Sequence, residues 1–578
     1  MSDTSRRSRA PIDTSGGRPP TPAEFTKARR IIARSGVLPV LQDRLDHADG
    51  RPRSLSVEGL LVAMQVNGLA RHHQGILAGF ARLLNSLIDR QRTTLGIRNW
   101  NPAQAYDRVD QLFNLLAKAT EQGWDAVVDG QPVRIDADWV LDRLLAASLQ
   151  DLPVWSSSVA VDGTDIDTWA KRPPWVDDVD LEFDGDDDDQ IETVKAPSRK
   201  KGKKKPIPAY GFDEEGEPIF TRDRDARWGH RSATSSRSSG SYIGYELHTA
   251  VLARDTGWSD GIRKLKLGPD VPPVITMISL VPAGSKRDAA VVPKLIAAKE
   301  AGFDVDDLIW DRGYSQLLPE NTSHPLNRAG IGQTFRPKDH QRGRKPFRDD
   351  ALLIEGQLVN AHVPEELQGL LPMPPMKATA EESTKYEEPF NRLAQYRLER
   401  HAGPDDEGAT RWRCPFCAGR LRSRQIPASM RRSRTTPLVD LPPGATCCNG
   451  IVTASAEELP HRQDFFPGTT AWRTSYNRRQ VVEGVNAMLK GGFVDIQHKF
   501  FRVFGLTKTK LLLAFTVVGY NLEAIRSFLA KKAAKAVTAA KDQGKRKKRR
   551  KGTWTQILGS PDQLASVLTE SGRAPPPT

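Results

Sequence analysis

The chain has 578 residues, with 85 lysines and arginines against 71 aspartates and glutamates, and its net charge is +14 at pH 7. This length is too great for one compact core, so we expect two or three domains, and the positive charge favours a polyanion such as nucleic acid as partner. The polar start excludes a signal peptide, the longest apolar run is shorter than the ~20 residues of a membrane helix, and four cysteines exclude a disulfide framework. The sequence therefore predicts a cytoplasmic protein with no membrane partner.

The first 150 residues divide into a short arm and a helical region. Residues 1–22 are rich in Ser, Pro, Gly and Arg, which predicts a disordered basic arm. In residues 23–150 the segment "GILAGFARLLNSLI" carries an apolar stripe of helical period, and Asn101, Pro102 and Gln104 are typical of the N-cap, N1 and N3 positions of a following helix. We expect an all-α domain, for which DNA binding and simple packing are both open.

The pattern changes to strands after residue 153. Residues 157–164, 241–253 and 272–283 predict three strands, residues 286–302 a helix that contains Pro293, and residues 306–314 a fourth strand. Between the first two strands, residues 172–208 join a dense acidic block to the basic run "RKKGKKKP". Opposed charge blocks of this density predict a flexible insertion, and a tether or a mimic of DNA charge fits the acidic half better than a metal site does.

Two of these strands contain an aspartate that a simple strand would not need. Asp162 lies inside "VAVDGT", and Asp311 ends the strand in "LIWDRGYS". Burying a carboxylate costs several kcal/mol unless a partner or a metal compensates it. The alternative is a strand-end aspartate that accepts hydrogen bonds from turn amides. Together the two suggest carboxylates that converge on one site, with Asp165 and Asp167 as less central competitors for the first position.

A third acid lies in "SYNRRQVVEGVNAMLK", residues 475–490. On a helix of 3.6 residues per turn, one face gathers four polar side chains within roughly 60°, and they are Tyr476, Arg479, Glu483 and Lys490. The opposite face gathers Val481, Val482, Val485, Met488 and Leu489. A solvated polar face is the simpler interpretation. With Asp162 and Asp311, however, Glu483 completes a set of carboxylates that suits divalent-metal phosphoryl transfer, and Arg479 and Lys490 could hold backbone phosphates.

These residues resemble those of bacterial insertion-sequence transposases of the DDE class. Tyr476, Arg479, Glu483 and Lys490 match that family's Y-x2-R-x3-E-x6-K signature, and "VAVDGT" and "WDRGYS" are similar to its first two catalytic-acid segments. The resemblance implies an α/β fold, namely a ribonuclease-H-like mixed sheet with flanking helices, preceded by the all-α domain and interrupted by an insertion domain. It covers about 155–315 and 465–530.

The resemblance also implies an activity. We expect a transposase that binds double-stranded DNA, cuts the ends of its element and joins the 3′-OH ends to target DNA, as a homodimer and with two Mg²⁺ or Mn²⁺ ions on Asp162, Asp311 and Glu483. Tyr476, Arg479 and Lys490 would contact the DNA. The alternatives are a catalytically inactive DNA-binding descendant of such an enzyme and a stand-alone metal nuclease of the same fold.

The predicted domains follow from these assignments. Residues 151–315 and 465–535 form the two parts of the catalytic domain, residues 316–464 an insertion domain, and residues 536–578 a basic tail suited to DNA phosphates. All four cysteines fall in the insertion, and they are Cys414, Cys417, Cys447 and Cys448. The CxxC spacing predicts half of a structural zinc site, whose other half could include His401 or His461; reduced thiols without metal are the alternative. Arginines around the cysteines form a basic field that suits DNA or a solvated loop.

Overall fold

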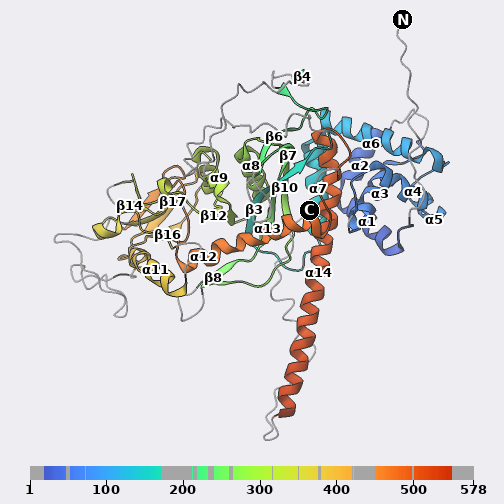
Figure 1. The fold of residues 1–578 in the computed structure, drawn as a ribbon. Coiled ribbons are helices and arrows are strands. Elements are labelled where there is room, and N and C mark those ends of the chain that lie inside the picture. Colours follow the sequence, from blue (N-terminus) through green and yellow to red (C-terminus); the bar gives the residue numbers. More distant parts are fainter. Residues whose placement is uncertain are drawn as a thin grey trace, which may run out of the picture.

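The computed structural model describes residues 18–46, 53–71, 73–170, 211–212, 218–231, 240–258, 265–315, 317–348, 351–374, 379–418, 421, 450–496 and 500–549. The predicted charged insertion (172–208), most of the N-terminal arm and the end of the basic tail lie outside these residues. Figure 1 shows a helical N-terminal part, a central sheet and a third part beyond the sheet, with one long helix crossing between the first two.

The N-terminal part is helical except for one hairpin. Its helices are α1 (Pro22–Ser35), α2 (Val37–Leu45), α3 (Val57–Leu69), α4 (Leu77–Ser86), α5 (Asp89–Thr94), the 3-10 turn η1 (Pro102–Gln104), α6 (Ala105–Gln122) and α7 (Ala137–Leu149). Asn101 caps η1, as predicted, because its side chain accepts a hydrogen bond from the Ala103 amide at 3.1 Å. The expectation of purely helical structure is wrong at β1 (Trp124–Val128) and β2 (Gln131–Ile135). Asp129 and Gly130 join them with φ of 52° and 78°, the signature of a tight Asp-Gly hairpin turn.

A mixed sheet forms the centre of the molecule. Its strands are β3 (Ser158–Asp167), β6 (Arg227–Arg231), β7 (Gly240–Ala253), β10 (Ile275–Pro282), β11 (Asp307–Trp310) and β12 (Gly332–Thr334), and helix α8 (Arg287–Glu300) connects β10 to β11. The order is β10-β7-β3-β11-β12, and β6 pairs with β7. β7 is antiparallel to both neighbours, whereas β3, β11 and β12 are parallel. The four predicted strands and the helix with Pro293 are confirmed, except that the fourth strand ends at Trp310 and the short helix α9 (Arg312–Ser315) takes up the end of its predicted range.

The two faces of the sheet belong to different hydrophobic clusters. Val159, Val161 and Trp310 pack with α8 in one cluster. Ala160 and Ile309, at the alternate positions, pack in the other with the helices of the C-terminal part. This alternation is the ordinary consequence of a two-residue repeat along a strand. It decides which face each polar side chain of β3 and β11 lies on.

The C-terminal part crosses the second face of the sheet. Helices α12 (Thr470–Tyr476), η7 (Asn477–Arg479), α13 (Gln480–Ala487) and the π-helical η8 (Met488–Gly492) follow one another, and α13 packs against β3 and β7. The long helix α14 (Leu506–Arg549) packs against α3, α7 and β10, and in Figure 1 its far end extends beyond the body of the protein. Its stretch Leu506–Thr538 is long and apolar enough to cross a membrane, but 72% of the most apolar window is buried inside the protein.

Two contacts explain how α14 docks. Asn521, which is fully buried, accepts a hydrogen bond from the Ile275 amide at 2.8 Å and donates to the Ile275 carbonyl at 2.9 Å and to Ser148 Oγ at 3.0 Å. It thereby satisfies the edge of β10. At the crossing with α3, a Cβ at Gly519 would lie 1.7 Å from the Gly68 carbonyl oxygen. The two backbones can therefore approach only because both positions are glycine.

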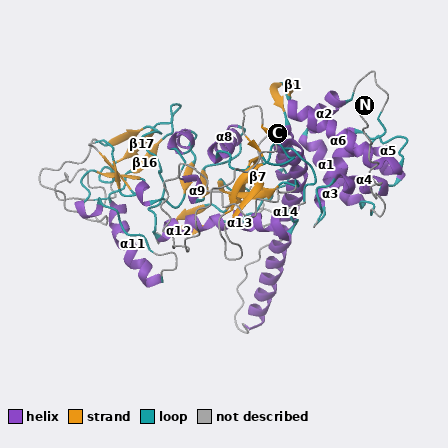
Figure 2. Ribbon diagram, turned by 45° about the horizontal axis from the view of Figure 1, so that its top comes forward, coloured by secondary structure: helices purple, strands orange, loops and turns teal. Residues whose placement is uncertain are grey.

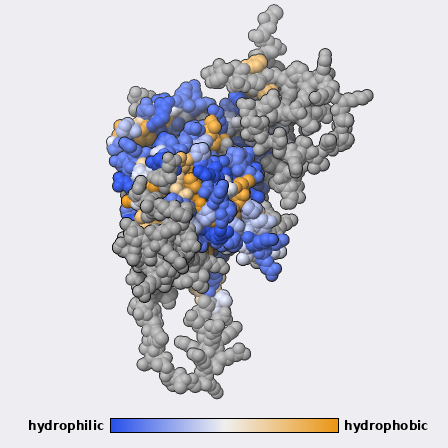
Figure 3. All heavy atoms as spheres, turned by 90° about the vertical axis from the view of Figure 1, so that its left-hand side faces the viewer, coloured by the Kyte–Doolittle hydropathy of each residue, from blue (hydrophilic) through white to orange (hydrophobic). Residues whose placement is uncertain are grey.

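The third part of the chain lies between β12 and α12. It contains two three-stranded sheets, β13 (Arg344–Lys345), β14 (Ala351–Ile354), β15 (Gln357–Asn360) and β16 (Glu399–Ala402), β17 (Thr410–Arg413), β18 (Ile451–Ala454), with α11 (Ala380–Gln395) beside them. Figure 2 shows these strands apart from the central sheet, and Figure 3 shows that the described surface on this side is largely hydrophilic. β12 pairs with β11, so the insertion starts later than the predicted residue 316.

The remaining elements are short. They are β4 (Gly211–Phe212), β5 (Pro218–Ile219), β8 (Thr256–Trp258), β9 (Leu265–Leu267), α9 (Arg312–Ser315), α10 (Ser323–Arg328) and the 3-10 turns η3 (Pro319–Asn321), η4 (Asp339–Gln341) and η5 (Glu365–Leu367).

Candidate active site

The register of the two parallel strands aligns Asp162 with Asp311. Trp310, the last residue of β11, pairs with Val161 of β3, so the next residue of each chain segment is one of the two aspartates. Parallel strands lie about 4.8 Å apart. Because Ala160 and Ile309 face the C-terminal helices, the alternation places Asp162 and Asp311 on that same face. The two predicted acids are therefore neighbours on the side of the sheet that α13 covers.

Glu483 comes from that covering helix. Val482, Val485 and Leu489 are buried against the core, as the predicted apolar face requires, and Val481 and Met488 pack at its margin. The glutamate lies on the other side of the helix, with 48% of its side chain exposed. The helix is not continuous, however, because a 3-10 turn precedes Gln480 and a π-helical turn follows Ala487.

Asp162 is partly buried and lies close enough to the other two acids to feel their charges. Burial raises the pKa of Asp162 from its ordinary value of 3.8 to about 6; the charge of Arg479 opposes that rise, and the charges of Asp311 and Glu483 add to it. Arg479 forms an ion pair with Glu483, and its Nη1 lies 3.9 Å from Asp162 Oδ2. Arg479 therefore lies between Glu483 and Asp162.

Tyr476 and Trp472 support this arginine. Their rings stack with centroids 4.8 Å apart and an angle of 9° between their planes, and the Arg479 guanidinium carbon lies 5.8 Å from the centre of the Tyr476 ring. Trp472 is buried, whereas Tyr476 is partly exposed. Tyr476, which we expected to contact DNA, therefore stacks on Trp472 and packs against the Arg479 guanidinium.

Lys490 reaches a different acid. Its Nζ lies 2.8 Å from Asp165 Oδ1, and Asp165 also accepts a hydrogen bond from Arg231 Nε at 2.8 Å. Arg231 in turn binds Asp167 at 2.5 Å. Asp165 and Asp167, the two competitors for the position of first acid, are thus engaged with basic side chains, and Asp162 remains the aspartate beside Asp311.

Arg478 and Arg479 are adjacent in the sequence, but their side chains have different partners. Arg478 is buried and holds the start of β3 and β11 together, since it donates hydrogen bonds to Ser158 Oγ at 2.9 Å and to Asp307 Oδ2 at 2.5 Å. The helical wheel and the resemblance both indicated Arg479 rather than Arg478 as the neighbour of Glu483, and the two side chains form an ion pair.

Two further residues near the acids were not predicted, Tyr314 and His248. Burial and the charge of Asp162 both raise the pKa of the Tyr314 phenol, which stays protonated at neutral pH. Burial lowers the pKa of His248 to about 3, so its imidazole is neutral. Tyr314 lies in the quoted segment "WDRGYS", but nothing in the linear sequence joins it to His248, since β7 meets β3 only through the sheet register.

The donor set of the site suits a hard divalent cation, because all three groups are carboxylates and the ionised form of Asp162 is disfavoured by burial and, to a lesser extent, by the charges of the other two. Among the described residues, no three His, Cys, Asp or Glu side chains lie close enough together to hold one ion. In this arrangement Glu483 is paired with Arg479.

The same finding applies to the predicted zinc site. Cys414 is buried, accepts a hydrogen bond from Asn360 Nδ2 at 3.3 Å, and lies with Cys417 at a turn. His401 and His461 do not complete a metal-binding group with them within the described part of the chain. Cys447, Cys448 and most arginines of the basic field lie outside that part, so the zinc prediction stays a prediction.

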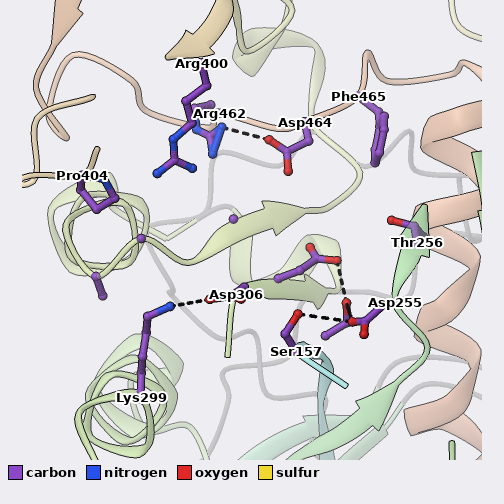
Figure 4. A pocket seen from close by; sticks show the side chains of 15 residues that line it. Ser157, Asp255, Thr256, Lys299, Asp306, Arg400, Pro404, Arg462, Asp464 and Phe465 are labelled. Carbon is purple, nitrogen blue, oxygen red and sulfur yellow. Dashed lines mark hydrogen bonds and ion pairs between the residues drawn. The ribbon is translucent and has the colours of Figure 1, made fainter. Parts of the chain in front are cut away.

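A polar cleft of about 620 Å³ lies at the other end of the sheet. Figure 4 shows Arg400 and Arg462 on one side and Lys299 on the other. Lys299 pairs with Asp306 at 2.7 Å and Arg462 with Asp464 at 3.0 Å. Lys299 and Arg462 are thus paired with acids of the cleft, whereas burial, with the charges of Asp311 and Glu483, raises the pKa of Asp162. The latter site is therefore the stronger candidate for chemistry.

Searches of protein-family models, curated proteins and solved structures found no match to this chain.

Proposed function

We propose that the protein is a metal-dependent DNA transposase that cuts the phosphodiester bonds at the ends of an insertion sequence and joins the freed 3′-OH ends to target DNA. The observation that carries this proposal is the convergence of Asp162, Asp311 and Glu483 from two adjacent strands and the helix above them. The surplus of 85 basic over 71 acidic residues supports a nucleic acid as the substrate.

The proposal includes the fold. In chain order, the main path of the central sheet runs third, second, first, fourth, fifth, with the second strand antiparallel and the fourth and fifth parallel to the first. This order, with α8 on one face and α13 on the other, is what the resemblance to ribonuclease-H-like enzymes leads one to expect.

The three acids have a defined role in this proposal. Asp162, Asp311 and Glu483 would hold two Mg²⁺ or Mn²⁺ ions, whose chemistry is to activate the attacking oxygen and to stabilise the leaving one. Arg479 would exchange Glu483 for a backbone phosphate of the DNA, and Lys490 would exchange Asp165 for another. Tyr476 would keep the guanidinium oriented during this exchange, since the ring lies beneath it.

This exchange couples the two ligands. In the DNA-free protein Arg479 competes with a metal ion for Glu483, and a phosphate would compete with Glu483 for Arg479. DNA should therefore raise the affinity for the metal, and by linkage the metal should raise the affinity for DNA by the same factor. In such a site Arg479 neutralises Glu483 in the protein alone, and the Glu483 carboxylate becomes available to the metal when a DNA phosphate takes its place on Arg479.

A strand-joining assay distinguishes the proposal from its two alternatives. A labelled duplex with the DNA that flanks this gene would be incubated with the protein, a circular target plasmid and Mn²⁺. We expect label joined to the plasmid, and none with Glu483→Gln. Cut duplex without joining would identify a nuclease of the same fold, and binding without cutting would identify an inactive DNA-binding descendant. Either result rejects the transposase. The number of protein copies bound to a pair of element ends tests the expected homodimer.

A further inference from the structure

The face of the sheet behind the acids holds a polar contact that the chemistry above does not use. Gly163 follows Asp162 on β3, so its position faces α8, and the register pairs it with His248 of β7. Tyr314, three residues after Asp311, reaches this place, and its hydroxyl lies 2.6 Å from His248 Nδ1. The contact therefore joins the segment after one acid to the strand beside the other.

The missing side chain of Gly163 makes room for this contact. A Cβ at that position would lie 3.2 Å from Tyr314 Oη, 3.1 Å from His248 Nδ1 and 3.0 Å from Glu246 Oε1. Three polar atoms thus surround the glycine that follows Asp162. Any larger residue would press on the hydrogen bond.

The Tyr314 ring is fixed from other directions as well. It stacks on Trp310 with centroids 5.7 Å apart and an angle of 13°, and the Arg287 guanidinium carbon lies 5.9 Å from its centre. Arg287 is itself held by Glu246 at 3.0 Å. The Tyr314 amide donates to the Asp311 carbonyl at 3.1 Å, which closes the turn that starts with the acid.

His248 is poorly suited to a purely stabilising role. It is fully buried, and its Nε2 finds no hydrogen-bond partner among the described residues. A buried polar atom without a partner weakens a fold, whereas an apolar side chain of similar size would not have this defect. The one described bond of its ring, to Tyr314, is the feature that an apolar residue could not supply.

We propose that Tyr314 and His248 are positioning residues that set the separation of the two catalytic aspartates. Their hydrogen bond ties the turn that begins at Asp311 to the sheet directly behind Asp162. Both residues act through the acids and touch no reacting atom, because they lie on the opposite face. The inference rests on the proposed metal site, and it extends that site by a supporting layer that holds the ligands at a fixed spacing.

Removing one oxygen tests this role. Tyr314→Phe in the full-length protein deletes the hydroxyl and keeps the stacked ring. Tyr520→Phe is the matched control, since that buried hydroxyl donates to the Pro273 carbonyl at 3.0 Å in the α14 region. Mn²⁺ binding without DNA, followed by electron paramagnetic resonance, and DNA cleavage at varied Mn²⁺ concentration would be measured for both variants, together with their thermal unfolding.

We expect equal losses of thermal stability but unequal effects on the site. Tyr314→Phe should raise the Mn²⁺ concentration for half-saturation about threefold or more and slow cleavage about 10- to 100-fold, as small displacements of catalytic groups do. Tyr520→Phe should leave both unchanged. His248→Leu should resemble Tyr314→Phe, and His248→Asn, which keeps a polar atom near the Nδ1 position, should recover part of the metal affinity.

Each other outcome is decisive. If Tyr314→Phe matches Tyr520→Phe in metal affinity and cleavage while the wild type cuts DNA, the positioning role is wrong and the transposase stands. If wild type binds Mn²⁺ through Glu483 but cuts no DNA, the transposase is wrong, and the Mn²⁺ half-saturation of the two variants still judges the positioning role. If the wild type binds no Mn²⁺ either alone or in the presence of DNA, both are overturned.

Discussion

Replacing Asp162 by asparagine should make the folded protein more stable at neutral pH. The carboxylate has 22% of its side chain exposed, and burial together with Asp311 and Glu483 raises its pKa from 3.8 to about 6, against the opposing charge of Arg479. Between these two values the folded protein keeps a proton that the unfolded chain has released. Stability therefore falls as the pH rises through this window, and the ionised form is the strained one.

The size of the effect follows from the shift. The pKa of Asp162 is about two units higher in the folded protein than in the unfolded chain. This difference lowers the free energy of unfolding by about 3 kcal/mol at pH 8.0, where the carboxyl is ionised in both states, and by only about 1 kcal/mol at pH 4.5. Asparagine removes the charge but keeps the oxygen that accepts a hydrogen bond from the Gly163 amide at 2.9 Å. The substitution should thus recover most of the penalty without a new packing defect.

Urea unfolding of both proteins, in the presence of a chelator and followed by tryptophan fluorescence, measures this gain at the two pH values. Asp306→Asn is the control, because that carboxylate is 56% exposed and pairs with Lys299, so its removal should change stability by about 0.5 kcal/mol or less. A gain that is equal at pH 4.5 and pH 8.0, or a loss at pH 8.0, would refute the claim that burial and the neighbouring acids destabilise the ionised Asp162.

Three further substitutions test other parts of the account. Arg479→Ala should raise the Mn²⁺ affinity of the DNA-free protein about tenfold, equivalent to about 1.4 kcal/mol, while end cleavage falls; calorimetry that shows weaker metal binding would contradict the competition for Glu483. Asn521→Leu should cost about 2 to 5 kcal/mol in urea unfolding, because the amide and carbonyl of the β10 edge lose their partner, and a loss below 1 kcal/mol would show that α14 does not depend on this anchor. Gly519→Ala should lower the free energy of unfolding in urea by about 3 kcal/mol or more, because its Cβ would collide with the backbone at the helix crossing. Gly484→Ala is the control, since its Cβ would meet nothing within 4 Å, and it should stabilise α13 by up to about 1 kcal/mol. Equal effects of the two substitutions would refute the close approach of α14 and α3.

Four of the six strands of the sheet, β3, β7, β10 and β11, were predicted from the sequence because their patterns are local. The strands and α8 follow from apolar runs and their breaks, and Asp162 and Asp311 were conspicuous because a carboxylate is unexpected in such runs. The face of α13 could be predicted as well, since the helical repeat fixes which of its side chains are buried together.

Features that depend on strand register, or on a partner residue far away in the sequence, could not be predicted. The pairing of Val161 with Trp310 aligns the two aspartates, and the three residues of β12 are too short for a strand pattern. The pairing of Lys490 with Asp165 joins positions 325 residues apart. The Asp129–Gly130 hairpin is different, because the Asp-Gly turn signal is present in the sequence, within a region whose other patterns are helical.

Metal-dependent cleavage of a plasmid that carries the DNA flanking this gene tests the central claim most directly. The wild type would be compared with Asp162→Asn, Asp311→Asn, Glu483→Gln and Asp165→Asn, with DNA binding measured in parallel. We expect nicks at fixed end positions with Mg²⁺ or Mn²⁺, none with the first three variants, and weakened but measurable cutting with Asp165→Asn, while all four variants still bind DNA when the metal is left out. Full cutting by Glu483→Gln, or loss of cutting by Asp165→Asn alone, would contradict the assignment of Asp162, Asp311 and Glu483 as the catalytic acids.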